Sequence, residues 1–165
     1  MGLWDSIKGA VNVVTGGAAK VAVDWQPALI VPGQPVAVRV TATSSGGQVK
    51  SGGVFVDVLG SEVVNVRNVS TGAPAAPGST NAPRPTHDVH VSNATFQQSF
   101  PIAPAFVLEA NETKTFQGTF ALPPGMQPSF QGKYATHQWS IRGRLETFGN
   151  DPDSGYQPAR VGLTA

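Results

Sequence analysis

The chain has 165 residues, no cysteine and a formal net charge of +1. That length is enough for one domain with a sizeable core, and the lack of cysteine excludes disulfides, thiolate nucleophiles and cysteine-ligated metal sites. The near-neutral charge provides no field that would gather a polyanion, so no nucleic-acid partner is expected. The 19 glycines and 14 prolines make up one fifth of the chain, which favours short strands joined by turns over a helical bundle.

The first fifteen residues are the only stretch with a helical period. Apolar residues recur there at spacings of three and four, and the Gly16-Gly17 pair that follows is a stop signal. The sequence therefore predicts a short amphipathic helix within residues 1–17, followed by a single β-domain over residues 18–165. The helix is barely long enough to be stable alone in water, so it needs a surface to lie on.

The apolar stripe of this helix is the predicted binding site for a partner or a membrane. Its residues are Leu3, Trp4, Ile7, Val11 and Val14. The stripe can pack on the chain's own domain, on another protein or a second copy, or on a bilayer, because the segment GLWDSIKGAV also resembles short membrane-active peptides. Asp5 offsets Lys8, which weakens attraction to an anionic membrane.

From Ala19 onward the period of the apolar residues changes to two, which is typical of half-buried strands. Eight strands are predicted, within residues 21–25, 36–40, 54–58, 87–91, 95–100, 105–110, 114–122 and 132–148. Strands of this length with turns at regular spacing favour an all-β, two-sheet antiparallel sandwich of immunoglobulin-like type. Its core is expected to centre on Trp25, Val38, Val56, Phe116, Phe120, Trp139 and Ile141.

The segment from Thr71 to Pro85 has a different composition. It holds four prolines among small and polar residues and no large apolar side chain. The sequence predicts a mobile surface loop there, dispensable for folding.

Residues 106–145 carry a resemblance to a known family. They read FVLEANETKTFQGTFALPPGMQPSFQGKYATHQWSIRGRL, and Pro32-Gly33 precedes the second predicted strand. This pattern resembles the signature half of arrestin-like N domains, and in size and layout the chain is most similar to the bacterial sporulation-control branch of that superfamily. In the proline-rich connection that leads into the last predicted strand, Phe130 and Tyr134 are expected to plug the end of the sandwich.

The resemblance implies an arrestin-like sandwich that binds proteins without catalysis. Relatives usually carry two tandem sandwiches, whereas 165 residues hold one. The charged residues look few and scattered along the chain, with no counterpart of the phosphate-sensing residues or the ion-pair core of visual and β-arrestins. Phosphoreceptor binding is therefore not implied.

No pattern of residues predicts an enzyme. His87-Asp88-Val89-His90 is the only cluster of potential metal ligands, and histidines three apart on a strand point to opposite faces. His137 is expected to be a satisfied core histidine, and the stretch Asp151 to Gly155 a plain turn rather than a calcium loop. No catalytic residue, cofactor, metal or small-molecule substrate is predicted.

Two classes of function remain. The first is a non-catalytic adaptor or regulator that binds a protein partner or itself, and that can be peripheral to a membrane through its helix. The alternative is a structural component of a larger assembly, such as a phage, injection or compartment particle, docked through the helix.

The N-terminus lacks a secretory signal and no stretch is long and apolar enough to span a bilayer, so a cytoplasmic location is expected. The N-terminal Met-Gly-x-x-x-Ser pattern also fits an N-myristoylation site. It is a weak signal, because it fixes only Gly2 and Ser6 and many unrelated chains match it by chance.

Overall fold

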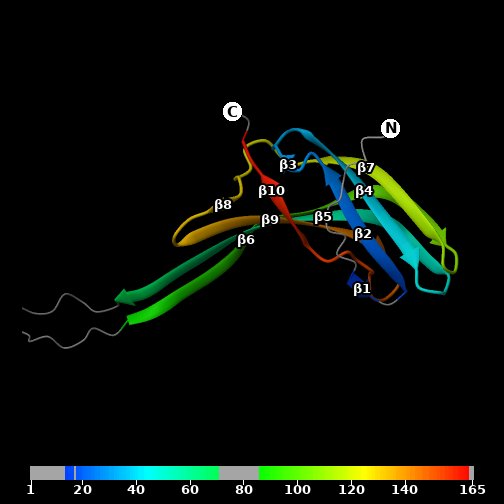
Figure 1. The fold of residues 1–165 in the computed structure, drawn as a ribbon, viewed down its shortest axis with the longest axis horizontal. Coiled ribbons are helices and arrows are strands. Elements are labelled where there is room, and N and C mark those ends of the chain that lie inside the picture. Colours follow the sequence, from blue (N-terminus) through cyan, green and yellow to red (C-terminus); the bar gives the residue numbers. More distant parts are fainter. Residues whose placement is uncertain (1–13, 17, 71–85, 164–165) are drawn as a thin grey trace, which may run out of the picture.

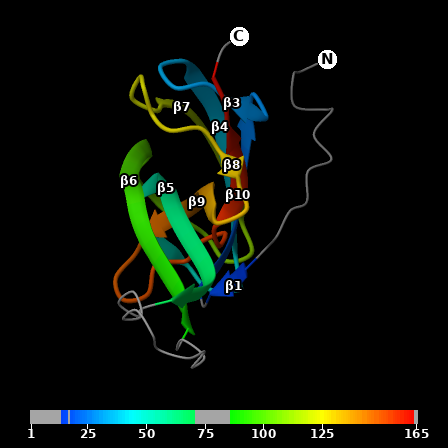
Figure 2. The same ribbon diagram turned by 90° about the vertical axis from the view of Figure 1, so that its left-hand side faces the viewer.

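The structure is a computed structural model that describes residues 14–16, 18–70 and 86–163. In these residues two β-sheets pack face to face, and a long hairpin runs out of one of them away from the sandwich (Figures 1 and 2). The all-β sandwich predicted from the sequence is confirmed.

Ten strands are formed by the described residues. In chain order they are β1 Val14–Gly16, β2 Ala19–Gln26, β3 Leu29–Ile30, β4 Pro35–Ser44, β5 Val49–Ser70, β6 Thr86–Leu108, β7 Thr113–Ala121, β8 Phe130–Gln131, β9 Ala135–Glu146 and β10 Gln157–Val161. The four-stranded sheet has the order β1-β2-β4-β7, and the other sheet has the order β3-β10-β9-β5-β6 with β8 paired to β9.

The core lies between the two sheets and follows the predicted alternation. On β4 every second residue is buried, and on β9 the buried positions run from His137 through Trp139 and Ile141 to Leu145. Of the predicted core residues, Val38, Val56, Phe120, Trp139 and Ile141 are buried, while Trp25 and Phe116 are half-buried and pack against the core. Period-two alternation is thus a reliable guide where one face of a strand meets the other sheet.

The turn predicted at Pro32-Gly33 meets the proline-rich crossover after β7. Gly33 has a φ of +83° and donates its backbone N–H to the Leu122 carbonyl over 2.8 Å, while a side chain at Gly33 would face the Pro124 ring at 3.5 Å. Glycine is favoured there because other residues rarely adopt this φ. The expectation that Phe130 and Tyr134 plug the end of the sandwich is wrong, since they are 36% and 52% exposed.

The predicted helix is wrong at its C-terminal end. Val14–Gly16 forms β1, which pairs with β2 so that Val14 lies opposite Val21 and Gly16 opposite Ala19. Consecutive β-branched residues before the glycines favour a strand, and the edge of β2 supplies the backbone partners that a helix end would lack. Residues 1–13 of the predicted helix lie outside the described residues.

Candidate functional site

The hairpin formed by β5 and β6 extends beyond the sheet that carries it. β9 flanks β5 as far as the pair Val64–Ala135, and the backbone N–H of Asn65 still donates to the Tyr134 carbonyl over 2.7 Å. Beyond Asn65, as far as Ser70, β5 pairs with β6 alone. The two strands project away from the sandwich in Figure 1. We call residues 61–70 of β5 and 86–94 of β6 the arm, and the rest of the described chain the body.

A β-bulge marks the root of the arm. The pairing of β5 with β6 shifts between Gly60–Phe96 and Ser61–Ala94, which leaves Thr95 as the extra residue in β6. The Thr95 hydroxyl lies 2.7 Å from Nε2 of the buried His137, and a side chain at Gly60 would meet the Trp139 ring at 3.2 Å. The bulge is therefore fixed to the core by a hydrogen bond, and such bulges bend a strand and increase its twist.

His137 is a structural residue, as the sequence predicts. Its Nδ1 lies 3.1 Å from the Pro128 carbonyl, which can only accept, so the ring donates there and Nε2 accepts the Thr95 hydroxyl proton. Its ring also stacks on Phe130 and meets Trp139 edge-on. Both ring nitrogens are thus engaged, and neither is available as a general base.

The two faces of the arm differ in character. Cross-strand partners share a face, and the pairs Val64–Val91 and Val66–Val89 place four valines together on one of them. We call this the valine face. Val91 is 54% exposed. A group of apolar side chains is unusual on a ribbon that is open to water on both sides, and it indicates a contact surface.

The opposite face of the arm is mostly polar, although Val63 also lies on it. It carries the pair Asn65–His90, in which Nδ1 of His90 is hydrogen-bonded to the Asn65 side chain. Asp88 accepts the backbone N–H of Asn68 over 3.0 Å, and Asn68 has a φ of +57° at a second irregularity in the pairing. His87 and His90 are on different faces, as expected, and no group of three potential metal ligands occurs in the described part of the chain.

The outer edge of β6 changes along its length. β6 is the last strand of its sheet, so no described strand pairs with this edge. In the body half of β6, Pro101 and Pro104 remove backbone donors, a bulge falls at Ile102, and Lys114 of β7 donates to the Val107 carbonyl over 2.7 Å. These are the devices by which proteins keep edge strands from pairing with other chains.

The arm half of the same edge lacks those devices. Residues 86–94 contain no proline, lysine or arginine, hold a single acidic residue, Asp88, and form nine consecutive residues without a bulge in β6. By contrast, the free edge of β5 in the arm is interrupted at Arg67 and Asn68. The edge at residues 86–94 is therefore open to pairing with another extended strand.

A shallow hollow lies where the arm joins the turn before β9. It has a volume of about 660 Å³ and is lined by both strands of the arm, with Lys133 and Tyr134 on the body side. The Lys133 ammonium lies 5.0 Å from the centre of the Tyr134 ring. The hollow adds an exposed aromatic and a cation to the surface next to the arm.

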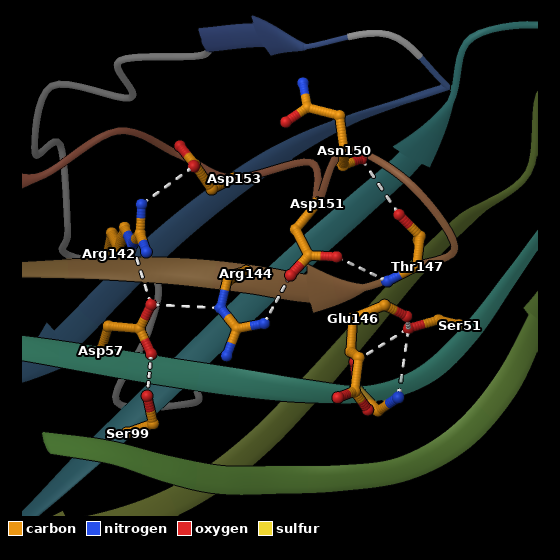
Figure 3. A network of polar contacts seen from close by, with 11 residues as sticks. Ser51, Asp57, Ser99, Arg142, Arg144, Glu146, Thr147, Asn150, Asp151 and Asp153 are labelled. Atoms are coloured by element: carbon orange, nitrogen blue, oxygen red, sulfur yellow. Dashed lines mark hydrogen bonds and ion pairs between the residues drawn. The ribbon is translucent and has the colours of Figure 1, made fainter.

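A cluster of charged side chains in the body is the second candidate site (Figure 3). Arg142 and Arg144 of β9 donate through Nε to the same oxygen of Asp57, at 2.8 Å and 3.2 Å, and Ser99 of β6 donates to the other oxygen. The outer nitrogens of the two arginines reach the loop between β9 and β10, where Arg142 pairs with Asp153 at 3.2 Å and Arg144 with Asp151 at 2.7 Å.

The protonation of this cluster follows from its charges. Burial by itself would raise the pKa of Asp57, whose side chain is only 7% exposed. Together, the hydrogen bonds from Ser99, Arg142 and Arg144 and the charge of Arg144 outweigh burial and lower the pKa. Burial would likewise lower the pKa of Arg144, but Asp151 and Asp57 raise it.

The charged cluster ties a loop to the sheet. Asp151 also accepts the backbone N–H of Thr147, Asp153 that of Gly155, and Ser154 and Gly143 exchange bonds, so the loop is held at several points. With three carboxylates and two guanidinium groups, the cluster has no positive charge to spare for an anion. The expectation that the charged residues are scattered is wrong, because the fold brings together residues as far apart as Asp57 and Arg144.

The predicted N-terminal site is mostly outside the described residues. Leu3, Trp4, Ile7 and Val11 are not described, and Val14 lies in β1 rather than on a helix. Among the described residues there is no helix long and apolar enough to cross a membrane. The sequence did not predict the arm as a site.

Comparison with known proteins shows the fold. No protein-family model matches the chain, and no curated protein matches it. Among solved structures it is similar to the sporulation control protein Spo0M from Bacillus subtilis, with a TM-score of 0.59 over 90% of this chain at 18% sequence identity. The chain has an arrestin-like fold, of the kind found in a sporulation-control protein. It covers 51% of the length of Spo0M.

Proposed function

We propose that the protein is a non-catalytic adaptor or regulator of arrestin-like type that binds another polypeptide along the arm. The observation that carries this proposal is the contrast within β6, whose edge is protected in the body and open at residues 86–94. An extended segment that pairs with this edge gains backbone hydrogen bonds for affinity, while side-chain contacts on the arm supply specificity.

The surroundings of the open edge support binding to a protein rather than to a charged ligand. The valine face offers apolar contacts to a strand that extends the sheet, and residues 86–94 carry only Asp88 as a fixed charge. A two-stranded ribbon is also marginally stable in water by itself, so a third strand would stabilise the arm.

Catalysis has no support in the described geometry. His137 is engaged through both ring nitrogens, and the charged cluster is closed on itself by its own ion pairs. An arrestin-like fold is generally non-catalytic, which agrees with the proposed adaptor role.

The N-terminal segment is the second contact in this proposal. Its apolar stripe, with Leu3, Trp4, Ile7 and Val11, would bind the same partner, a second copy or a membrane surface, and the protein would act in the cytoplasm. The stripe and the arm are far apart in the sequence, so each can be changed without altering the residues of the other.

Photo-crosslinking in the cell of origin tests the proposal. A photoreactive phenylalanine derivative is placed at His90 on the open edge and, as the matched control, at Val107 on the protected half of the same strand. We expect discrete crosslinked species from position 90 and none from position 107, with both variants retaining the wild-type melting temperature.

Mass spectrometry of the crosslinked species identifies the partner. A partner linked to residues of the arm supports binding along the edge. If position 90 gives no product, or if positions 90 and 107 give the same products, the arm is not the binding element and the adaptor proposal fails.

A further inference from the structure

The open edge has a pattern that suits one particular partner, a second copy of this chain. We propose that two chains pair along residues 86–94 of β6, antiparallel and related by a two-fold axis, so that the two arms form one continuous four-stranded sheet. The inference rests on the arm being the interaction element and names its occupant.

The first step concerns register. In a two-fold antiparallel pair, each residue faces a residue at the same distance on the other side of the axis, and hydrogen-bonding positions match only when the axis passes through a residue. Among the described residues, the unbulged stretch of β6 runs from Thr86 to Ala94 and ends at the bulge at Thr95. An axis at His90 pairs all nine of these residues across the two copies.

The second step concerns the side chains that this register brings together. With His90 on the axis, Val89 of one copy lies opposite Val91 of the other on the valine face, and the reverse pair lies next to it. Such β-branched cross-strand pairs stabilise sheets. The valine faces of the two arms then join into one apolar surface, and the 54% exposed Val91 gains a neighbour.

The third step concerns charge. The single acidic residue of the stretch, Asp88, faces Ser92 of the second copy, and His87 faces Asn93. The two carboxylates of Asp88 are kept apart, and the one residue that faces its own copy is His90 on the axis. Like charges set opposite each other are a usual means by which an edge resists pairing with itself, and this register places no two carboxylates opposite each other. An axis at Asp88 would set the two carboxylates against each other and is disfavoured.

The fourth step concerns access. The arm projects from the sandwich (Figures 1 and 2), and no described strand lies along the outer edge of β6, so a second arm can lie beside it. On the body side the ladder must stop, because the bulge at Thr95 breaks the register and Pro101 removes a donor. The pairing uses the same edge on both chains, so it closes at two copies and does not propagate into a polymer.

The chain contains no cysteine, which makes single-cysteine variants an unambiguous test. His90→Cys places the thiol on the axis, and mild oxidation of the purified full chain should give a disulfide-linked dimer on non-reducing gels. His87→Cys and Asn93→Cys should each stay monomeric alone and form a linked dimer when mixed. Val107→Cys, on the protected half of β6, is the matched control and should not crosslink.

Light scattering across a concentration series gives a second readout without cysteines. Wild-type protein is expected to shift from monomer to dimer, and Val91→Lys, which opposes an ammonium to Val89, should weaken the dimer about tenfold or more. Val107→Lys introduces the same charge at an exposed valine of the body half and should leave the dimer unchanged.

Three results would overturn the inference: a monomer at all concentrations, a dimer that Val91→Lys does not weaken, or crosslinking at position 107 equal to that at 90. These failures are distinct from failure of the adaptor proposal. If crosslinking in cells at position 90 yields a different protein while the purified chain stays monomeric, the edge binds a heterologous partner, and self-pairing is wrong.

Discussion

The two halves of β6 belong to one strand, but one half packs on the core and the other is exposed. From Phe96 to Leu108 the strand packs over the core, and its edge is interrupted by prolines, a bulge and a lysine bond from β7. From Thr86 to Ala94 it is almost entirely exposed, and its edge is uninterrupted. The difference indicates that the body half is built for stability and the arm half for contact with another chain.

The charged cluster also shows how the body differs from the arm. In the body, polar side chains are partnered within the chain, so that the Asp57 carboxylate is satisfied by Ser99 and two arginines. On the arm, backbone groups along nine residues of the outer edge have no described strand beside them. Mutations in the two regions should therefore affect different measurements, stability in the body and association on the arm.

The largest expected effect on stability is in the core of the body. Phe120 is buried and its ring lies 5.1 Å from that of Phe100 of β6. Phe120→Ala should lower the free energy of unfolding by about 3–5 kcal/mol, measured by chemical denaturation. The exposed neighbour Thr119 supplies the control, and a loss no larger than that of Thr119→Ala would remove Phe120 from the core.

Loss of the central carboxylate should be the next largest effect. Asp57→Ala leaves Arg142 and Arg144 beside each other without their shared partner. Because Asp57 is buried and the arginines are partly buried, the loss should be about 2–3 kcal/mol, toward the lower end of the range for breaking a buried ion pair. The control is Glu112→Ala, which removes an exposed pair with Lys114 and should change the unfolding midpoint far less. Equal losses in the two variants would show that the cluster adds no more than a surface pair.

The cluster also predicts a dependence of stability on pH. Because the pKa of Asp57 is lowered from its usual value of 3.8, its contribution is complete above that pH and is lost as the pH falls through the folded-state pKa. Wild-type protein should therefore lose more unfolding free energy than Asp57→Asn between about pH 4 and pH 2. Parallel pH curves for the two proteins would contradict this interpretation.

The sequence predicted those parts of the fold in which one face of a strand is buried. Alternation identified β4 and β9 because Val36, Val38 and Val40, or Trp139 and Ile141, all face the other sheet. It divided β6 into three shorter strands, and one of the two predicted breaks falls at residues 101–104, which include Pro101 and Pro104. Both prolines are compatible with a continuous strand because they lie at the edge of the sheet.

The arm and the charged cluster were not predicted, for different reasons. In the β6 half of the arm almost every side chain is exposed, so its pattern carries little signal of burial. The cluster depends on β5 pairing with β9, which brings Asp57 opposite Arg142, 85 residues away in the chain. The one local signal was the pattern Arg142-Gly143-Arg144 on a strand whose other face is buried. Two arginines on one face of such a strand indicate that acidic partners lie nearby.

The smallest expected effect concerns the segment of residues 71–85, which joins the two strands of the arm in the sequence. The register of the arm is set by the pairs from Ser61–Ala94 to Ser70–Thr86, and the segment has no large apolar residue to contribute to a core. Replacing it with a short glycine-serine linker should leave the melting temperature within about a few degrees, because loop-closure entropy changes slowly with length. The variant should also keep the disulfide crosslink at His90→Cys, since the open edge lies in β6 itself. A large fall in melting temperature would show that the segment packs on the sandwich, whereas an unchanged melting temperature with loss of the crosslink would move the contact between copies from the strand edge to the segment.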